Sequence, residues 1–548
     1  MKKMKASELM VKCLENEKVQ YIFGIPGEEN LDLMDALLES QIEFIQTRDE
    51  RGAAFMADVY GRLTGSAGVC LATLGPGAMN LVTGVADANM DRAPLVAITG
   101  QASLDRMHKE SHQYMDVVSV FKQMTKWNTL IHLPDIIPES ISKAFKTAIS
   151  EKPGATHIDF PEDVASMQID SEPMRHDFPS EAEPVEACLK RAAQLINDAK
   201  QPIILAGNGV VRQDASRILT QFAELTNIPV AHTFMGKGCI PMTHRLSLLS
   251  VGLQANDYVS CGFDRADLVI AIGYDIVEYH PRLWNPNQDK KLIHIDTQPS
   301  ESDSSYVTDV EMVGNIKQSL RHLMTEEIYP KDSEYASNTL RKIILDQLSE
   351  YKEDKEFPIK PQKILSDIRS ILAEDDILIS DVGAHKMWIA RMYPCYKPNT
   401  CIISNGFASM GIAVPGAFVA KLIYPERKCL AVCGDGGFLM NSQEIETATR
   451  VGVPFVTLIF NDEAYGLIEW KQMNGFGRPA HIDFTNPDFV KYAEAFGAKG
   501  YRVEGSDELI PILNDAFQQT VPSVIDCPVN YAENLRLTNE LGQLTCPI

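Results

Sequence analysis

Residues 430–438 read LAVCGDGGF, an apolar run that ends in the turn Gly434-Asp435-Gly436-Gly437. After a stretch of helical pattern, a second apolar run at 455–460 ends in Asn461-Asp462-Glu463-Ala464-Tyr465. Strand, turn and helix in this order predict two parallel strands joined by a right-handed crossover, with their carboxyl ends side by side. The two aspartates are therefore expected to lie close together.

This pair of aspartates suggests a metal site. Glycine turns let backbone N–H groups approach phosphate oxygens, but an aspartate beside a phosphate is repulsive unless a cation lies between them. Asp435 and Asp462 are thus candidate ligands of Mg²⁺, which prefers few carboxylates plus phosphate oxygens. Both segments could also be plain structural turns, and Gly-Asp-Gly alone does not decide between these interpretations.

Short apolar runs alternate with amphipathic stretches along most of the chain, which predicts stacked α/β domains with mainly parallel sheets. Residues 171–184 and 325–362 interrupt this alternation with charges and prolines and are interpreted as inter-domain connections. We expect three domains, at 1–180, 185–345 and 355–548, and no internal repeat is visible. The expected strands include 21–25, 69–73, 95–99, 203–206, 268–272, 292–295, 377–380, 430–432 and 455–460.

The composition limits the possible partners. The 548 residues carry 51 Lys and Arg against 74 Asp and Glu, a net charge of −23, which opposes binding to nucleic acid or to an anionic membrane. No run of eighteen apolar residues and no signal peptide is present, so we expect a cytoplasmic protein that does not span a membrane. The 11 cysteines include no CxxC pair, which argues against a disulfide framework and a zinc site and favours a reducing compartment.

A second group of candidate residues lies near the N-terminus. Residues 22–28 read IFGIPGE, and residues 48–58 read RDERGAAFMAD. Glu50 could simply be a solvated residue at the start of a helix. However, the small residues at 53, 54 and 57 suit a helix packed closely against another surface, which would leave Glu50 at the mouth of an interface.

Together, the spacing of these elements resembles the thiamin diphosphate enzymes, in which Gly-Asp-Gly precedes Asn-Asn by a fixed distance. The resemblance implies that Mg²⁺ is bound by Asp435, Asp462 and the backbone carbonyl of Ala464. Most members carry Asn at the position of Asp462, whereas the fermentative acetolactate synthases carry Asp. It also implies that Glu50 hydrogen-bonds the aminopyrimidine ring and relays a proton, and that the three domains bind the pyrimidine, lie centrally and bind the diphosphate, in that order.

Three further segments agree with this resemblance: 73–80 (TLGPGAMN), 381–385 (DVGAH) and 404–411 (SNGFASMG). By analogy, Met410 separates the two cofactor rings and Ala408 offers its carbonyl to the aminopyrimidine. Each segment alone could be a structural turn, and Met410 could be core filler. The implied cofactor-binding residues are Gly27, Glu50, Thr73, Asn80, Gly383, His385, Ala408, Met410, Gly434, Asp435, Gly436, Gly437, Asp462, Ala464 and Tyr465.

Within this superfamily the chain resembles the catabolic acetolactate synthases, through residues 106–116, 126–127 and 273–281. The implied reaction decarboxylates pyruvate and joins the two-carbon unit to a second pyruvate, giving 2-acetolactate, with other small 2-oxo acids as possible substrates. His112 and Gln113 would lie beside the substrate and form the catalytic set with Glu50, although both could be ordinary loop residues. The resemblance also implies a site completed by two subunits, with a homodimer as the minimal active unit and a homotetramer expected.

Two features leave alternatives open. The segment 203–210 resembles a dinucleotide fingerprint but lacks its third glycine, and the segment at 274–278 lacks the arginine of the flavin-binding relatives, so no FAD is expected. Glu469 and Trp470 are larger or more acidic than in the fermentative enzymes, which favours a non-oxidative 2-oxo-acid decarboxylase as the first alternative; both could also face solvent. A noncatalytic paralogue that binds the cofactor is the second.

Overall fold

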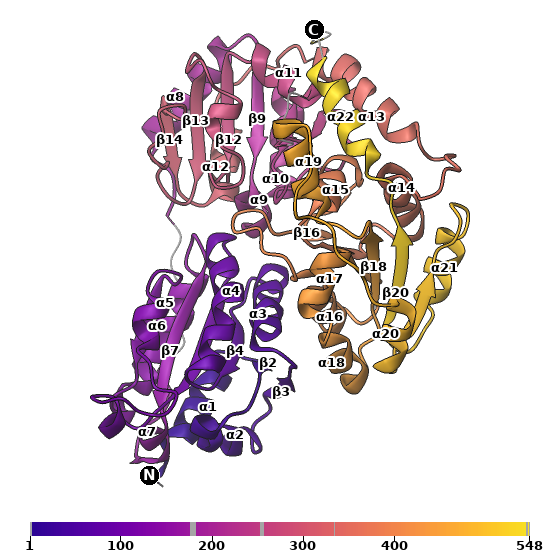
Figure 1. Ribbon diagram of the computed structural model, residues 1–548. Coiled ribbons are helices and arrows are strands. Elements are labelled where there is room, and N and C mark those ends of the chain that lie inside the picture. Colours follow the sequence, from indigo (N-terminus) through magenta and orange to yellow (C-terminus); the bar gives the residue numbers. More distant parts are fainter. Residues whose placement is uncertain (1–2, 176–181, 253–256, 334, 544–545, 547–548) are drawn as a thin grey trace.

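Three six-stranded sheets, one in each third of the chain, form the framework of the protein (Figure 1). The computed structural model describes residues 3–175, 182–252, 257–333, 335–543 and 546. All neighbouring strands within these three sheets run parallel. Each of the nine strands predicted from the apolar runs lies in one of them, so the α/β class is confirmed.

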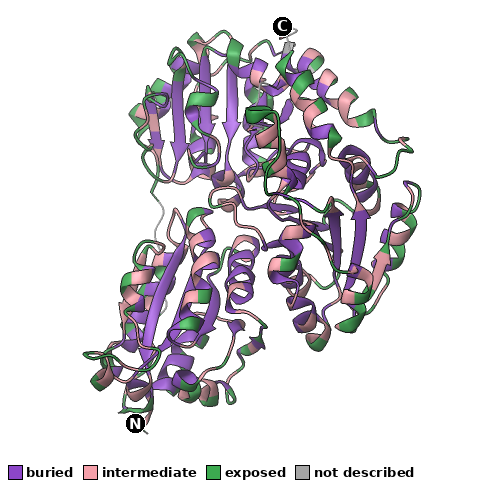
Figure 2. Cartoon of the chain, in the orientation of Figure 1, coloured by how far each residue is buried: buried purple, intermediate pink, exposed green. Residues whose placement is uncertain are grey.

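The N-terminal sheet has the order β3-β2-β4-β5-β7-β6. Its strands β4, β5 and β7 are buried along their whole length, as expected for a parallel sheet with covered faces (Figure 2). The strands are β2 (Tyr21–Gly24), β3 (Glu43–Gln46), β4 (Gly68–Ala72), β5 (Leu95–Gln101), β6 (Trp127–Leu130) and β7 (Ala155–Pro161), and β1 (Met4–Lys5) pairs with β8 (Gln168–Ile169) separately. The helices are α1 (Ala6–Asn16), α2 (Leu31–Leu37), α3 (Glu50–Thr64), α4 (Pro76–Met90), α5 (Val117–Phe121), α6 (Ile137–Ile149) and α7 (Glu162–Ser166).

The central sheet has the doubly wound order β11-β10-β9-β12-β13-β14, in which the chain runs outward from β9 to β11 and then returns to place β12 on the other side of β9. The strands are β9 (Pro202–Ala206), β10 (Val230–His232), β11 (Ser247–Ser250), β12 (Leu268–Ile272), β13 (Lys291–Asp296) and β14 (Val310–Val313). The helices are α8 (Glu186–Asp198), α9 (Asn208–Arg212), α10 (Ser216–Thr226), α11 (Tyr258–Arg265) and α12 (Ile316–Leu323).

The C-terminal sheet repeats the topology of the N-terminal one. Its order, β16-β15-β17-β18-β20-β19, places the second, first, third, fourth, sixth and fifth strands side by side, as in the first sheet. This duplication is not visible in the sequence. The strands are β15 (Ile377–Ser380), β16 (Cys401–Ile403), β17 (Cys429–Gly434), β18 (Val456–Asn461), β19 (Lys499–Arg502) and β20 (Ser523–Pro528). The helices are α14 (Pro361–Ile371), α15 (Ala384–Met392), α16 (Ala413–Ile423), α17 (Asp435–Asn441), α18 (Glu444–Val451), α19 (Gly466–Phe476), α20 (Phe489–Ala495), α21 (Leu509–Ala516) and α22 (Ala532–Gly542).

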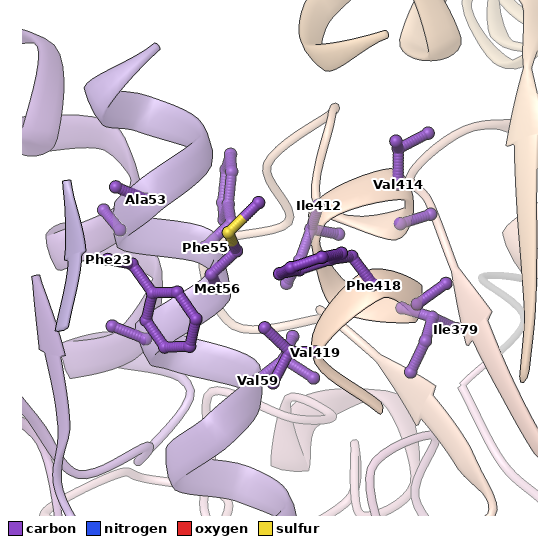
Figure 3. Close-up of a cluster of buried hydrophobic side chains, with 14 of the residues drawn as sticks. Phe23, Ala53, Phe55, Met56, Val59, Ile379, Ile412, Val414, Phe418 and Val419 are labelled. Atoms are coloured by element: carbon purple, nitrogen blue, oxygen red, sulfur yellow. The ribbon is translucent and has the colours of Figure 1, made fainter. Parts of the chain in front are cut away.

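One hydrophobic core joins the first and third domains. Phe55 and Val59 of α3 belong to the same buried cluster as Ile412, Phe418 and Val419, from α16 and the residue before it (Figure 3). The Ala-rich face of α3, predicted to pack closely against another surface, is fully buried. The helix that begins at Glu50 is therefore fixed by both domains.

The predicted connections lie between the sheets. Residues 171–184 fall between β8 and α8, and 176–181 are outside the described residues. Residues 325–362 contain a π-helical segment, Tyr335–Leu340, and α13 (Arg341–Ser349). The exact limits of the three domains stay a prediction. No helix in the described part of the chain combines the length and apolar composition that crossing a membrane requires.

The interpretation of the cysteines was wrong for one pair. A disulfide joins Cys261 of α11 to Cys546 near the C-terminus, and the other nine cysteines are free. The two residues are 285 positions apart and are brought together only by the fold, so their spacing carried no signal. The argument for a reducing compartment is weakened accordingly.

Candidate active site

Asp435 and Asp462 lie at the carboxyl ends of adjacent strands, as predicted. Strands β17 and β18 are paired in register, with Gly434 opposite Phe460. Asp435 is the first residue of α17, and Asp462 directly follows β18. The right-handed crossover inferred from the sequence therefore brings the two segments together.

Burial makes this pair of carboxylates suited to a cation. The Asp435 carboxylate accepts hydrogen bonds from the backbone N–H groups of Gly436 (2.8 Å) and Glu463 (2.7 Å). Desolvation raises the pKa of Asp435, and desolvation together with the charges of Asp435 and Glu469 raises the pKa of Asp462 to about 8. A bound cation would relieve this repulsion.

The donor set fits a cation that also takes ligands from a phosphate. Among the described residues, no group of three or more His, Cys, Asp or Glu side chains could hold a metal ion by itself. Two carboxylates and a backbone carbonyl leave room for further oxygen ligands, as Mg²⁺ prefers. Ala464 is buried and forms an isolated antiparallel bridge with Asp483, which fixes its backbone beside this pair.

Asn486 was missed by the sequence analysis. Its amide donates to Asp435 (2.8 Å) and to the side-chain oxygen of Asn461 (3.0 Å). Its own side-chain oxygen is buried without a hydrogen-bond partner. Asn486 lies in an irregular segment between α19 and α20, where no strand end or glycine motif marked it.

His385 lies next to the glycine turn. It is 1% exposed, and burial lowers its pKa to about 3, so the ring is neutral at pH 7. Its Nε2 atom is buried without a hydrogen-bond partner. A Cβ atom on Gly383 would lie 2.7 Å from the ring, and one on Gly434 3.4 Å from it. The ring therefore offers an unpaired nitrogen within the same group of residues, which fits a polar ligand.

The remaining C-terminal candidates surround this group. A Cβ atom on Gly436 would lie 2.8 Å from the ring of Tyr465, and one on Gly437 3.3 Å from the carboxyl carbon of Asp381. Asp381 in turn accepts the N–H of Gly411 at 2.8 Å, next to Met410. The structure thus joins the segments 381–385, 404–411 and 434–437 into one site.

The N-terminal candidates form a second group. Glu50 is 9% exposed and accepts a hydrogen bond from the side-chain amide of Asn80 (3.0 Å). Thr73 donates its hydroxyl to Glu29 (2.8 Å), and a Cβ atom on Gly27 would clash with Thr73 at 2.4 Å. A Cβ atom on Gly77 would lie 3.0 Å from Thr73 and 3.2 Å from Glu50, so these residues lie together near the carboxyl ends of β2 and β4 and the start of α3.

His112 and Gln113 lie on an exposed loop beside this second group. Gln113 has a φ of +56°, and a Cβ atom on Gly75 would lie 2.6 Å from its carbonyl oxygen. Arg106 donates to the carbonyl of His112 at 3.3 Å and forms an ion pair with Glu162 at 2.9 Å. Both side chains are exposed in the single chain.

The two groups are connected through Glu444 and the backbone before Glu50, and not through the carboxylates of Glu50 and Asp435. The Glu444 carboxylate of α18 accepts the N–H groups of Arg48 (3.1 Å) and Asp49 (3.0 Å), just before Glu50. In the hydrogen bonds and ion pairs of the described residues, Glu50 and Asp435 share no partner. A single chain therefore contains both groups, but no shared hydrogen-bond or ion-pair partner in the described part of the chain links Glu50 to Asp435.

Trp470 packs within the C-terminal domain. Its ring stacks on Trp388 (6.4 Å between centroids, 17° between planes), and its Nε1 donates to Thr538 of α22 at 2.7 Å. The alternative that Trp470 faces solvent is also wrong, because it packs against the domain core. Glu469, in contrast, is close enough to Asp462 to raise its pKa.

In the central domain, Glu278 occupies the dinucleotide-like turn. Its carboxylate accepts the N–H of Asn208 (3.1 and 3.2 Å), and its burial raises its pKa to about 7. A cavity of about 630 Å³ opens at this edge where the three domains meet, and none of the predicted site residues line it. The Glu278 carboxylate therefore binds the N–H group of Asn208, which in a dinucleotide-binding turn would bind a phosphate oxygen.

Comparison with protein-family models gives three matches in the predicted order. Residues 4–120 match the model described as "Thiamine pyrophosphate enzyme, N-terminal TPP binding domain". Residues 189–323 match the central domain of the same enzymes, and residues 381–527 match their C-terminal TPP binding domain. The two matched TPP-binding domains contain the two groups of candidate residues.

Curated relatives match nearly the whole chain. An "Acetolactate synthase" of Bacillus subtilis (strain 168) is 34% identical over 98% of this chain and 95% of its own length. A "Probable acetolactate synthase large subunit" of Methanocaldococcus jannaschii is 37% identical over 99% of this chain and 95% of its own. An "Acetolactate synthase, catabolic" of Raoultella terrigena is 34% identical over 98% and 97%.

Proposed function

This chain belongs to the thiamine pyrophosphate enzymes and, among them, to the acetolactate synthases, and from that premise we propose that it makes 2-acetolactate and CO₂ from two molecules of pyruvate. The observation that carries this proposal is the similarity to three acetolactate synthases over at least 98% of the chain. The two groups of site residues give it a chemical basis.

The residues present fit thiamin diphosphate. When bound, this cofactor supplies a nucleophilic thiazolium carbon and an electron sink for decarboxylation. Glu50, buried and held by Asn80, would hydrogen-bond the aminopyrimidine and relay the proton that this activation requires. His385 offers an unpaired neutral nitrogen toward the diphosphate side, and Ala408 and Met410 would position the rings.

We propose Mg²⁺ as the cation, held by Asp435, Asp462 and the carbonyl of Ala464. The support is the mutual repulsion between buried Asp435 and half-buried Asp462, and the small number of protein ligands. A dication between the two aspartates and the diphosphate would offset part of their combined negative charge and reduce their mutual repulsion. An anionic protein could hold an anionic cofactor in this way without a basic patch.

No FAD is proposed. The support is Glu278, which takes the N–H of Asn208 and is also hydrogen-bonded by the Thr233 hydroxyl. Asp275 beside it forms ion pairs with Arg92 (2.9 Å) and Lys152 (3.4 Å). Inserting a dinucleotide phosphate here would place it against an existing buried carboxylate, which is electrostatically unfavourable.

We propose a homodimer as the minimal active unit, assembled into a homotetramer, with Glu50 of one chain facing the Asp435 group of another. The support is that one chain holds both groups but does not connect their functional atoms. A cytoplasmic location also stays a proposal, and the Cys261–Cys546 disulfide is evidence against its reducing-compartment argument.

The first alternative is a non-oxidative 2-oxo-acid decarboxylase. Glu469 favours it, because an acid near the metal-binding candidates could protonate the reacting carbon. Trp470 gives it no added support, since its ring stacks on Trp388 and its Nε1 donates to Thr538. No feature observed in the described residues favours the second alternative, a noncatalytic paralogue. The key residues of both groups are present and are buried or partly buried: Glu50, Asp435, Asp462 and His385.

The proposal is tested by metal and cofactor dependence. Protein stripped with EDTA should make no acetolactate from pyruvate until both thiamin diphosphate and Mg²⁺ are restored, and added FAD should change nothing. Acetolactate production that requires FAD would refute the cofactor assignment. Acetaldehyde as the sole product would refute the function and support the decarboxylase.

A further inference from the structure

A buried ionic cluster links the N-terminal domain to the 404–410 loop of the C-terminal domain. Arg62 of α3 contacts three carboxylates: Asp58 through Nε (2.6 Å), Asp87 through Nη2 (2.8 Å) and Asp91 through Nη1 (3.0 Å). The three aspartate side chains are 0% exposed, and Arg62 is 8% exposed. We refer to these four residues as the Arg62 cluster.

Two of these carboxylates, Asp91 and Asp87, also accept hydrogen bonds from the loop. Asp91 accepts the backbone N–H groups of residues 405 (3.1 Å), 406 (2.6 Å) and 407 (3.2 Å). Asp87 accepts the hydroxyl of Ser404 (2.8 Å) and the N–H of Ser409 (3.2 Å). Five donors of one loop therefore converge on two side chains from another domain.

The contact requires a close approach. A Cβ atom on Gly406 would lie 2.5 Å from a carboxylate oxygen of Asp91, so no larger residue fits without movement. The Lys386 ammonium also contacts the loop, at the side-chain oxygen of Asn405 (3.2 Å). The loop is thus bound by both anionic and cationic side chains.

Stability alone is a weak explanation for this cluster. Three buried carboxylates face one guanidinium, and burial and mutual repulsion raise the pKa of Asp87 well above its usual range. Buried ion pairs often stabilise a fold no more than apolar residues of the same volume do. What the cluster provides is a fixed geometry for the groups that it contacts.

That geometry matters most at Ala408, which has a φ of +59°. A non-glycine residue in this left-handed region is strained, and such a conformation persists only when the surroundings impose it. Ala408 lies between two of the held groups, with Phe407 N–H bound to Asp91 and Ser409 N–H bound to Asp87. The cluster therefore holds the unusual conformation on both sides of Ala408.

We propose that Asp87 and Asp91, oriented by Arg62, are positioning residues that keep Ala408 and Met410 in the conformation needed to hold the thiamin diphosphate rings. This inference rests on the proposed function, in which these two residues contact the cofactor. The cluster would act through the loop and would not touch the substrate.

The test uses Asp91→Ala and Ser404→Ala in the full-length protein, with Ser523→Ala as the matched control. Ser523 is equally buried in the same domain and donates its hydroxyl to the carbonyl of Ala516 (3.3 Å), far along the chain from the loop. Asp91→Ala leaves Arg62 two carboxylates, so the ionic pairing of the cluster survives.

Three readouts separate positioning from a general structural defect: cofactor affinity by tryptophan fluorescence, kcat and KM for acetolactate formation, and the near-ultraviolet circular dichroism of bound cofactor. We expect Asp91→Ala to weaken cofactor binding at least tenfold and to lower kcat about 100-fold, because three hydrogen bonds to a charged group are lost. The KM for pyruvate should change less than threefold in this variant. Ser404→Ala should lower kcat about fivefold, because one such bond is lost, and alter the dichroism, while Ser523→Ala should match the wild type.

Wild-type cofactor affinity and kcat in folded Asp91→Ala would overturn the inference, as would equal losses in Ser523→Ala. The binding measurement does not depend on turnover. If the wild type binds thiamin diphosphate but makes no acetolactate, the proposed function fails while the binding data still decide the role of the cluster. If the wild type binds no cofactor, both fail.

Discussion

The substitution Glu50→Gln removes one proton-transfer group while keeping its size and its main contact. The Glu50 carboxylate is 9% exposed and accepts one hydrogen bond, from Asn80 at 3.0 Å. A glutamine carbonyl can accept the same bond, so the free energy of unfolding should change by less than about 1 kcal/mol. Loss of a general acid or base costs about 10²- to 10⁴-fold in rate, or about 3–5 kcal/mol in the activation barrier.

The assay follows acetolactate formation at saturating thiamin diphosphate and Mg²⁺, together with exchange of the cofactor's thiazolium proton into deuterated water. We expect both rates to fall at least 100-fold. Glu533→Gln is the matched control, since Glu533 is 7% exposed, accepts a bond from the Gln362 amide at 2.7 Å and lies in α22. A drop below tenfold in Glu50→Gln, or an equal drop in the control, would refute the assigned role.

Further predictions concern the neighbourhood of the site. The substitution Trp470→Phe removes the hydrogen bond to Thr538 but keeps the ring stacking on Trp388. It should destabilise the protein by about 1 kcal/mol in thermal unfolding and leave the product ratio of acetolactate to acetaldehyde unchanged. A shift toward acetaldehyde would contradict this structural role. Burial raises the pKa of Glu278 to about 7, from 4.5 in the unfolded chain, so the folded state binds this proton more tightly. The free energy of unfolding of the wild type should therefore fall as the pH rises from about 4.5 to about 7, by up to about 3 kcal/mol. Glu278→Gln lacks this dependence, so its urea-unfolding free energy relative to the wild type should rise from pH 5 to pH 8; a constant difference would show that Glu278 does not titrate as inferred. Purified protein should carry no flavin absorbance, and bound flavin would contradict the role given to Glu278.

Many of the site residues that the sequence predicted lie at the ends of apolar runs or in glycine turns. Asp435 and Asp462 could be expected to lie close together because parallel strands align their carboxyl ends, and the structure pairs β17 with β18. Glu50 stood out because small residues followed it, and α3 is indeed buried between two domains. Regular periodicity therefore predicted most of the fold class and the closeness of the two aspartates, whereas most other site residues were predicted from the resemblance to the thiamin diphosphate enzymes.

What the sequence did not predict depends on contacts between distant segments. Asn486 reaches Asp435 across 51 positions from an irregular segment. Asp91 reaches Gly406 across 315 positions, and Cys261 is bonded to Cys546 across 285. No local pattern encodes such pairings, because each is set by how finished domains pack. The repeated sheet order could not be predicted for the same reason, because strand order depends on which strands pair in the folded domain and not on a repeat of residues.

The most direct test of the central claim is the stoichiometry of pyruvate conversion. Pyruvate labelled at its carboxyl carbon is incubated with the protein, thiamin diphosphate and Mg²⁺, and CO₂, 2-acetolactate and acetaldehyde are quantified by NMR. An acetolactate synthase should release one CO₂ and form one acetolactate for every two pyruvates consumed, with little acetaldehyde. One CO₂ and one acetaldehyde per pyruvate, without acetolactate, would contradict the account.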